Sequence, residues 1–95
     1  MKYTLELTTA FKKDLKRCIK RGLKKNKFDK VVNILQKGEK LDIKYRDHQL
    51  VDSKHYKNCR ECHIQPDWLL VYRIENNILV LTLLRTGTHS DLFEK

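Results

Sequence analysis

The sequence predicts an α+β domain in which two N-terminal helices pack on one face of an antiparallel β-sheet. Apolar residues recur at helical spacing between residues 8 and 38, whereas beyond residue 40 they alternate or form short runs of branched and aromatic side chains. Two short helices cannot bury their apolar stripes alone, so a sheet from the second half must cover them. The chain has 95 residues with no repeat or linker, so we expect one domain over residues 1–95.

The first half begins with a strand and a helix. Residues 2–7 alternate between apolar and polar side chains, which is the period of a half-buried strand. Thr8 or Thr9 is suited to cap the helix that follows, and Gly22 is suited to end it in a left-handed conformation. The apolar residues of this helix have the i, i+4, i+7, i+8 spacing of one face: Phe11, Leu15, Cys18 and Ile19.

A second helix is predicted from about residue 27 to residue 37. Asn26 precedes it as a candidate N-terminal cap, and Gly38 follows it as a terminator. Its apolar positions again form one stripe: Phe28, Val31, Val32 and Leu35. Both stripes are expected to face the sheet.

The second half is predicted to supply three further strands. Residues 57–65 form one strand, which stops at a proline because proline lacks the N–H that a sheet ladder needs. Residues 68–74 and 78–85 form the next two. A tight turn at residues 75–77 joins them, where asparagine tolerates a positive φ. Residues 90–95 are expected to add one short helical turn.

The charge and hydropathy of the chain limit its class and its partners. Lys and Arg total 21 and Asp and Glu total 12, which gives a net charge of +9. Such an excess attracts polyanions, either nucleic acid or an acidic protein; a basic surface without a partner is the alternative. The longest apolar run, residues 68–72, is far shorter than the ~20 residues that cross a bilayer, and no signal peptide is apparent. We therefore expect a cytoplasmic protein without membrane contact.

Cys59, Cys62 and His63 form a C-x-x-C-H string, the attachment signature of c-type haem. Residues three apart on a strand point to opposite faces, and the single methionine is Met1, so haem attachment is not expected. Four ligands at zinc spacing are not visible either. Together with Cys18 the cysteines number three, so we predict no disulfide framework, no metal and no cofactor.

Polar residues at or just beyond the predicted strand ends form a candidate site: His48, His63, Asp67, Arg85 and His89. His63 shares a strand face with Glu61, opposite Cys62, and is expected to face away from the helices. His55, by contrast, is interpreted as a solvated loop residue.

This set is suited to metal-free RNA cleavage. Histidine titrates near neutrality and can act as base or acid when a ribose 2′-OH attacks its own phosphate. Arginine can hold the phosphate oxygens as negative charge builds. Trp68 or Phe93 is a candidate to stack on an unpaired base. Each of these residues alone is also common in an ordinary structural role.

Three segments resemble the YafQ branch of the RelE/ParE superfamily of bacterial toxins. They are residues 45–50 (YRDHQL), 60–72 (RECHIQPDWLLVY) and 84–93 (LRTGTHSDLF). Their order and spacing match the family, and the two-helix first half fits it too. The resemblance therefore covers nearly the whole chain.

The resemblance implies helices on one side of a curved antiparallel sheet. It also implies a ribosome-dependent endonuclease that cuts mRNA in the A site of the 70S ribosome and is silenced by an acidic antitoxin similar to DinJ or RelB. The catalytic group carried over by motif is His48, His63, Asp67 and His89. Arg85 would bind phosphate, while Trp68 and Phe93 would help position the substrate. Which histidine is base and which is acid stays open.

Two other functions are compatible with this fold. One is a ParE-like toxin that binds a protein target such as DNA gyrase. The other is a basic module that binds RNA or an antitoxin without catalysis. Three histidines and an aspartate at one surface favour the nuclease, because a gyrase binder has no need of them.

Overall fold

The computed structural model describes residues 1–51 and 56–93. Its elements in chain order are β1 (Thr4–Leu7), α1 (Thr9–Lys20), α2 (Lys25–Gln36), the 3-10 turn η1 (Ile43–Tyr45), β2 (His48–Gln49), β3 (Arg60–Gln65), β4 (Trp68–Glu75), β5 (Val80–Gly87) and α3 (His89–Phe93). His55 and residues 94–95 lie outside the described residues. No helix within the described ranges is long and apolar enough to cross a lipid bilayer.

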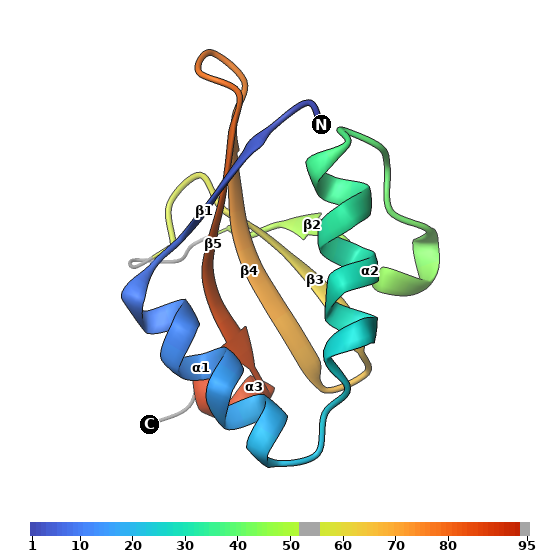
Figure 1. Cartoon of the computed structure of the whole chain (residues 1–95), viewed down its shortest axis with the longest axis vertical. Coiled ribbons are helices and arrows are strands. Elements are labelled where there is room, and N and C mark those ends of the chain that lie inside the picture. The colour runs from blue at the N-terminus through green and yellow to red at the C-terminus, as the bar shows by residue number, and fades with distance from the viewer. Residues whose placement is uncertain (52–55, 94–95) are drawn as a thin grey trace.

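The five strands form one mixed sheet in the order β1-β5-β4-β3-β2 (Figure 1). Strands β2 to β5 pair antiparallel, whereas β1 pairs parallel to β5, with Thr4 opposite Val80 and Leu7 opposite Leu83. The predicted α+β class is confirmed, but the expectation of a purely antiparallel sheet is wrong at β1. The direction of this pairing depends on the path of the chain between the two strands, about which the local period of a strand carries no information.

Helices α1 and α2 lie on the same face of the sheet, as expected (Figure 1). Thr8 caps α1, since its Oγ1 accepts a 3.0 Å hydrogen bond from the N–H of Phe11. The predicted cap of α2 is wrong: Lys24 occupies the cap position without a side-chain hydrogen bond, and Asn26 lies inside the first turn. The rings of Phe11 and Phe28, with centroids 5.6 Å apart, join the two helices.

The core lies between these helices and the sheet. It contains most of the predicted stripe residues: Phe11, Cys18, Phe28, Val31, Val32 and Leu35. Cys62 and Ile64 of β3 belong to the same cluster. Because side chains alternate along a strand, Glu61 and His63 project from the opposite face, as the sequence predicts.

The turn between β4 and β5 differs from the prediction. It covers residues 76–79, and its positive φ of 54° falls on Leu79 rather than on an asparagine. Asn76 instead accepts a 2.6 Å hydrogen bond from the hydroxyl of Tyr3. The turn is thus tied to the N-terminal segment by a contact across 73 residues of sequence, which local turn preferences cannot reveal.

Candidate active site

His48, Glu61 and His63 form a polar cluster on the face of the sheet opposite the helices. His48 of β2 lies directly opposite Glu61 of β3 in the antiparallel register, and His63 follows two residues later on the same face. Nε2 of His48 lies 3.2 Å from Oε1 of Glu61, and Nε2 of His63 lies 3.7 Å from the same oxygen. The sequence analysis did not include Glu61 in the site, although its shared strand face with His63 was a usable signal.

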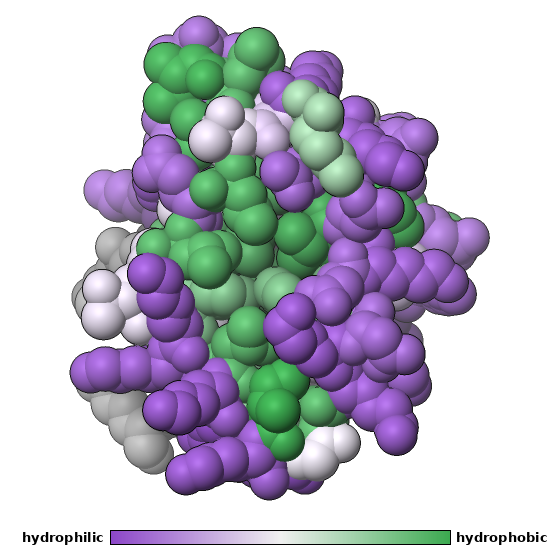
Figure 2. Space-filling view, viewed as in Figure 1, coloured by the Kyte–Doolittle hydropathy of each residue, from purple (hydrophilic) through white to green (hydrophobic). Residues whose placement is uncertain are grey.

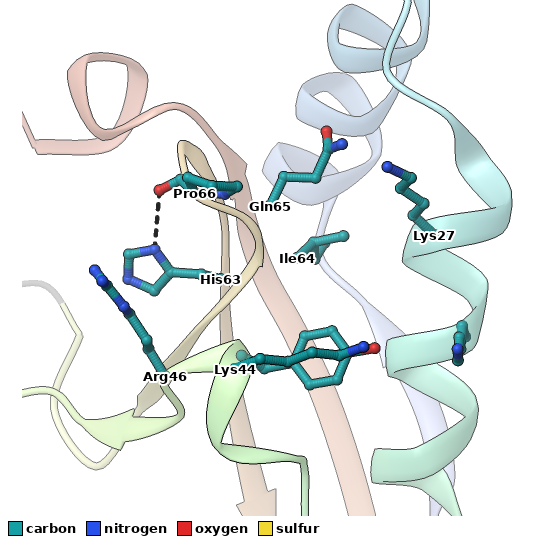
Figure 3. A pocket seen from close by; sticks show the side chains of 9 residues that line it. Lys27, Lys44, Arg46, His63, Ile64, Gln65 and Pro66 are labelled. Carbon is teal, nitrogen blue, oxygen red and sulfur yellow. Dashed lines mark hydrogen bonds between the residues drawn. The ribbon is translucent and has the colours of Figure 1, made fainter.

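The other ring nitrogen of each histidine lies beside a backbone carbonyl. Nδ1 of His63 is 3.1 Å from the oxygen of Pro66 (Figure 3), and Nδ1 of His48 is 3.2 Å from the oxygen of Gln49. Carbonyl and carboxylate oxygens only accept hydrogen bonds, so each ring can donate from Nδ1 to its carbonyl and, when the ring is protonated, also from Nε2 to Glu61. Nε2 of each ring therefore faces Glu61.

The segment before β2 is anchored on the sheet. Asp47 accepts a 3.1 Å hydrogen bond from Nη2 of Arg60 and a short hydrogen bond from the hydroxyl of Tyr72. The carboxylate of Asp47 raises the pKa of the Arg60 guanidinium. No sequence pattern predicted the two-residue strand β2, and this anchor places its first residue, His48, beside β3.

The turn between β3 and β4 connects His63 to His89. Oδ1 of Asp67 accepts a 3.0 Å hydrogen bond from the N–H of His89, the first residue of α3. Pro66, the neighbour of Asp67, supplies the carbonyl that orients His63. The structure therefore brings His63, Asp67 and His89 to one end of the sheet, as the sequence predicted for its strand ends.

The short helix α3 is held at its start by a reciprocal cap. Oδ2 of Asp91 accepts a hydrogen bond from the N–H of Thr88 at 2.9 Å, and Oγ1 of Thr88 accepts one from the N–H of Asp91 at 3.1 Å. Nη1 of Arg21, the C-cap residue of α1, lies 2.7 Å from Oδ2 of Asp91. These contacts, with Arg21 the largest cause, lower the pKa of Asp91 to about 2. They fix the position of His89.

Arg85 is engaged inside the molecule. Its Nε and Nη2 contact the buried carboxylate of Asp14 on α1 at 2.5 and 3.1 Å, and its Nη1 lies 3.4 Å from the hydroxyl of Tyr56. The bonds to Asp14 raise the pKa of Arg85, so it stays a cation. Its side chain is 28% exposed. Of its three guanidinium nitrogens, Nη1 is the one that Asp14 does not contact.

Trp68 departs from the role that the sequence analysis expected. Its side chain is only 1% exposed, and its indole N–H donates a 2.9 Å hydrogen bond to Oγ1 of Thr86. A ring packed in the core on the helix side cannot stack on an RNA base. Phe93, in contrast, is 38% exposed, and its ring lies 5.3 Å from that of His89 between centroids.

A basic cavity of about 490 Å³ adjoins His63 (Figure 3). Its lining residues are Lys27, Lys30, Lys44, Tyr45, Arg46, His63, Ile64, Gln65 and Pro66. Within residues 1–51 and 56–93, none of these four cationic side chains forms an ion pair with a carboxylate. The sequence analysis predicted a basic protein but not this concave cluster, because the cluster joins α2 to the η1 segment.

The cysteines take no part in the candidate site. Cys18, Cys59 and Cys62 are free thiols and are buried. Burial raises the pKa of the Cys62 thiol, which keeps it neutral in the core. The C-x-x-C-H string therefore places two thiols in the interior and the imidazole of His63 on the outer face.

Comparison with known proteins assigns the chain to a family. Residues 3–94 match the family described as bacterial toxin of type II toxin-antitoxin system, YafQ. This chain belongs to the YafQ family of toxins. Two proteins named mRNA interferase toxin YafQ, from Escherichia coli strains B / BL21-DE3 and K12, are 36% and 34% identical over 90 residues, 94% of either chain.

Solved structures of YafQ-like toxins share the fold. A metal-bound toxin from Helicobacter pylori is 43% identical, with a TM-score of 0.87, over 96% of this chain and 99% of that one. The toxin in the E. coli DinJ-YafQ complex is 35% identical, with a TM-score of 0.85, over 96% and 98%. The expected family and fold are confirmed, and so is the class of activity, that of the mRNA interferases.

Proposed function

We propose that this YafQ-family chain is a ribosome-dependent mRNA endonuclease that stops translation, and that His48, His63, Asp67 and His89 form its active site. The supporting observation is the coupling of two histidines through one turn: Pro66 orients the ring of His63, and Asp67 holds the backbone of His89. Two imidazoles so arranged can serve one reaction as base and acid.

The proposed reaction starts with attack by a ribose 2′-OH on the adjacent phosphate. One histidine removes the 2′-OH proton as the 2′-oxygen bonds to phosphorus. The other donates a proton to the 5′-oxygen as the bond between phosphorus and that oxygen breaks. The products are a 2′,3′-cyclic phosphate and a 5′-hydroxyl end. Glu61 orients His48 and His63 and forms a charge-assisted hydrogen bond with whichever is protonated.

Further residues are proposed to hold the substrate. Nη1 of Arg85 offsets the charge that builds on the phosphate oxygens. The exposed ring of Phe93 stacks on a base near His89. The basic cavity beside His63 binds the neighbouring RNA backbone, since phosphate contacts fix position without reading sequence. Trp68 contributes only through the core that supports β4.

The proposed reaction needs no metal ion. Histidines carry both protons, and Arg85 offsets the developing charge. The one group among the described residues with the ligand atoms for a metal contains two of the proposed catalytic histidines, and it is not the carboxylate-rich set that Mg²⁺ prefers.

We also propose that a cognate acidic antitoxin controls this chain, as DinJ forms a complex with YafQ in E. coli. Figure 2 shows apolar surface between α1 and α2, flanked by hydrophilic side chains. A groove of about 360 Å³ there is lined by apolar side chains that include Leu7, Phe11, Leu15 and Phe28. An antitoxin segment lying in this groove would hold the complex after charge brings it in. Because the target is the ribosome, the site of action is the cytoplasm.

The end groups of the cleaved RNA test the proposed chemistry. We expect 70S ribosomes carrying a defined mRNA to yield, with this chain, fragments ending in a 2′,3′-cyclic phosphate or a 3′-phosphate. Fragments ending in a 3′-hydroxyl would contradict attack by the 2′-OH. Growth arrest that persists without any mRNA cleavage would instead support a protein target such as gyrase.

A further inference from the structure

We propose that Asp14 on α1 is a positioning residue of the nuclease, which holds Arg85 so that Nη1 of its guanidinium faces the RNA phosphate. Asp14 was not among the residues that the sequence analysis placed in the site. Because Arg85 is a phosphate ligand only in the proposed function, this role of Asp14 rests on that function. The contacts between the two side chains do not depend on it.

An extra residue in β5 turns Arg85 toward the outer face of the sheet. Strict alternation would place Arg85 on the same face as Leu83, which belongs to the core under the helices. The pairing with β4 shifts at this point. Val71 lies opposite Arg85, whereas the next residue of β4, Tyr72, lies opposite Leu83. Leu84 is therefore the extra residue of a bulge, which aims the side chain of Arg85 away from the helices.

A row of paired residues joins Arg85 to the histidine cluster on that outer face. Val71 lies opposite Arg85 on one side and opposite Glu61 of β3 on the other. Glu61 lies opposite His48 in turn. Directly paired residues project from the same face, and neighbouring strands are about 4.8 Å apart, so the backbone of Arg85 lies roughly 10 Å from that of Glu61. The guanidinium and the imidazoles therefore share one surface.

Asp14 contacts Arg85 at the open edge of β5. Strand β1 pairs with β5 only as far as Leu83, and α1 lies beside β5 beyond this point (Figure 1). There Oδ2 of Asp14 accepts a 3.1 Å hydrogen bond from the N–H of Thr86, in place of a strand partner. The same carboxylate contacts Nε and Nη2 of Arg85 at 2.5 and 3.1 Å. Two parallel contacts of this kind fix both the position and the plane of a guanidinium.

The carboxylate of Asp14 is itself held in place. The residue is 4% exposed, and Nη2 of Arg17, one turn later on α1, lies 3.3 Å from its Oδ1. A buried ion pair adds little stability compared with apolar residues of similar volume, because both charges lose their hydration. The orientation that Asp14 gives to Arg85 therefore explains a buried carboxylate here better than stability does.

The ion pair leaves Nη1 of Arg85 on the side that leads to His89. Nη1 lies 3.4 Å from the hydroxyl of Tyr56. The ring of Tyr56 lies edge-on to that of Phe93, with centroids 6.0 Å apart. Phe93 lies 5.3 Å from the ring of His89. The nitrogen offered to the phosphate is thus connected by contacts to one of the proposed acid and base residues.

Loss of Asp14 should affect the transition state more than substrate binding. Negative charge on the phosphate oxygens grows as the 2′-oxygen bonds to phosphorus, so a donor that is already in position stabilises that stage most. Without the carboxylate, the long side chain of Arg85 has to be ordered during the reaction, and this cost adds to the barrier.

The kinetic test compares the parent chain with Asp14→Asn on 70S ribosomes that carry a defined mRNA. We expect kcat to fall by about 10²-fold, within the usual range for loss of one donor to the transition state, while KM stays nearly unchanged. The matched control Glu75→Gln removes the carboxylate that contacts Arg73 at the far end of β4 and should cleave as the parent does. A kcat of Asp14→Asn equal to that of the parent would overturn the proposal.

Variants of Arg85 give a second test that does not depend on the folding of Asp14→Asn. In Arg85→Lys the charge remains, but a single nitrogen cannot contact Asp14 and the phosphate together. We therefore expect Arg85→Lys to cleave as slowly as Arg85→Ala, and parental cleavage by Arg85→Lys would overturn the proposal. Adding Asp14→Asn to Arg85→Ala should lower kcat no further, because Asp14 acts through Arg85. A further loss would show a separate role for Asp14 and contradict the proposal.

Nitrogen-15 relaxation of the Arg85 side chain tests the ion pair without RNA. The Nε–H group of Arg85 should be ordered on the picosecond-to-nanosecond timescale in the parent and in Glu75→Gln, and mobile in Asp14→Asn. Equal order in all three proteins would show that Asp14 does not hold Arg85. A parent chain that never cleaves mRNA would contradict the proposed function, while the relaxation result still decides whether Asp14 fixes the guanidinium.

Discussion

At the scale of single residues, the hydrogen bond that each imidazole ring makes to a carbonyl decides which of its nitrogens is left for the proposed proton transfer. The carbonyl of Pro66 holds Nδ1 of His63, so in the proposed reaction Nε2 is the atom that would exchange protons at the outer face of the sheet. The backbone N–H of His89 is held by Asp67, which leaves the ring of His89 exposed. Asp67 thus acts on the position of His89, whereas the sequence analysis placed it among the catalytic residues without assigning it a separate role.

Removal of either imidazole should separate activity from folding. We expect His63→Ala and His89→Ala each to lower mRNA cleavage by about 10²–10⁴-fold, the usual contribution of a general acid or base. Both should keep the circular dichroism spectrum of the parent, since neither ring belongs to the core. Growth and mRNA integrity after induction are the measurements, with the exposed-residue variant Lys13→Ala as control. Full toxicity in both histidine variants would contradict the assigned roles.

The two aromatic residues that the family resemblance assigned to the substrate should behave differently. Trp68→Phe removes the hydrogen bond to Thr86 from a buried ring, so we expect a loss of roughly 1–3 kcal/mol in the free energy of unfolding and an unchanged KM. Phe93→Ala should weaken RNA binding by about 1–3 kcal/mol, the range for stacking on one base. Urea unfolding and KM for mRNA cleavage distinguish the two. A raised KM for Trp68→Phe at unchanged stability would show that the core position is not its role.

At the scale of elements, the short helix α3 depends on contacts outside itself. Five residues are too few for a stable isolated helix. The cap between Thr88 and Asp91 and the ion pair with Arg21 hold it against α1. Gly87 permits this close approach, because a Cβ there would lie 2.9 Å from Oδ2 of Asp91, and its φ is +156°. The position of His89 therefore depends on contacts with α1 and β5 as well as on α3 itself.

The pH dependence of stability should report the contacts of Asp91. Its pKa falls from 3.8 to about 2 on folding, so its contribution to stability is fully present above the ordinary pKa and is lost as the pH falls through about 2. We expect the parent chain to melt at a higher temperature than Asp91→Asn near neutral pH, with the difference shrinking between about pH 4 and pH 2. Thermal unfolding of both proteins across that range is the measurement. A difference that stays constant with pH would contradict the lowered pKa.

At the scale of the whole molecule, the net charge of +9 shapes encounters with both proposed partners. The positive electrostatic field of the chain attracts both RNA and an acidic antitoxin. These two partners therefore compete for the chain before any specific contact forms. The apolar groove between α1 and α2 and the basic cavity beside His63 lie in different parts of the structure. An antitoxin seated in the groove must therefore extend to the site or block entry to the ribosome.

Association with the antitoxin should be steered by charge. We expect its association rate constant to fall as salt is raised, because exposed charges are screened over about 8 Å at physiological ionic strength. The dissociation rate should change less, since in the proposed complex apolar contacts in the groove hold the antitoxin. Stopped-flow mixing across a salt series gives both rates. An association rate that is independent of salt would refute the steering.

Much of this molecule was predictable from local patterns. The apolar stripe of α2, most of that of α1, the Thr8 cap and the alternation along β3 depend on residues within one or two turns of each other, and the structure confirms them. The prediction that Ile19 belongs to the stripe of α1 is wrong, since Ile19 is 39% exposed. The order and spacing of the segments around His48, His63 and His89 also predicted the family.

Contacts between distant residues decided the rest. Glu61 belongs to the candidate site because His48 lies opposite it on the neighbouring strand. Arg85 forms its ion pair with Asp14, which is 71 residues away in the sequence. The parallel pairing of β1 with β5 and the burial of Trp68 against Thr86 have the same origin. The amino-acid sequence by itself determined the elements, the charge and the family, because these depend on composition and short-range spacing. Only the tertiary structure decided which side chains meet, since a hydrogen bond or an ion pair depends on the path of the chain between its partners.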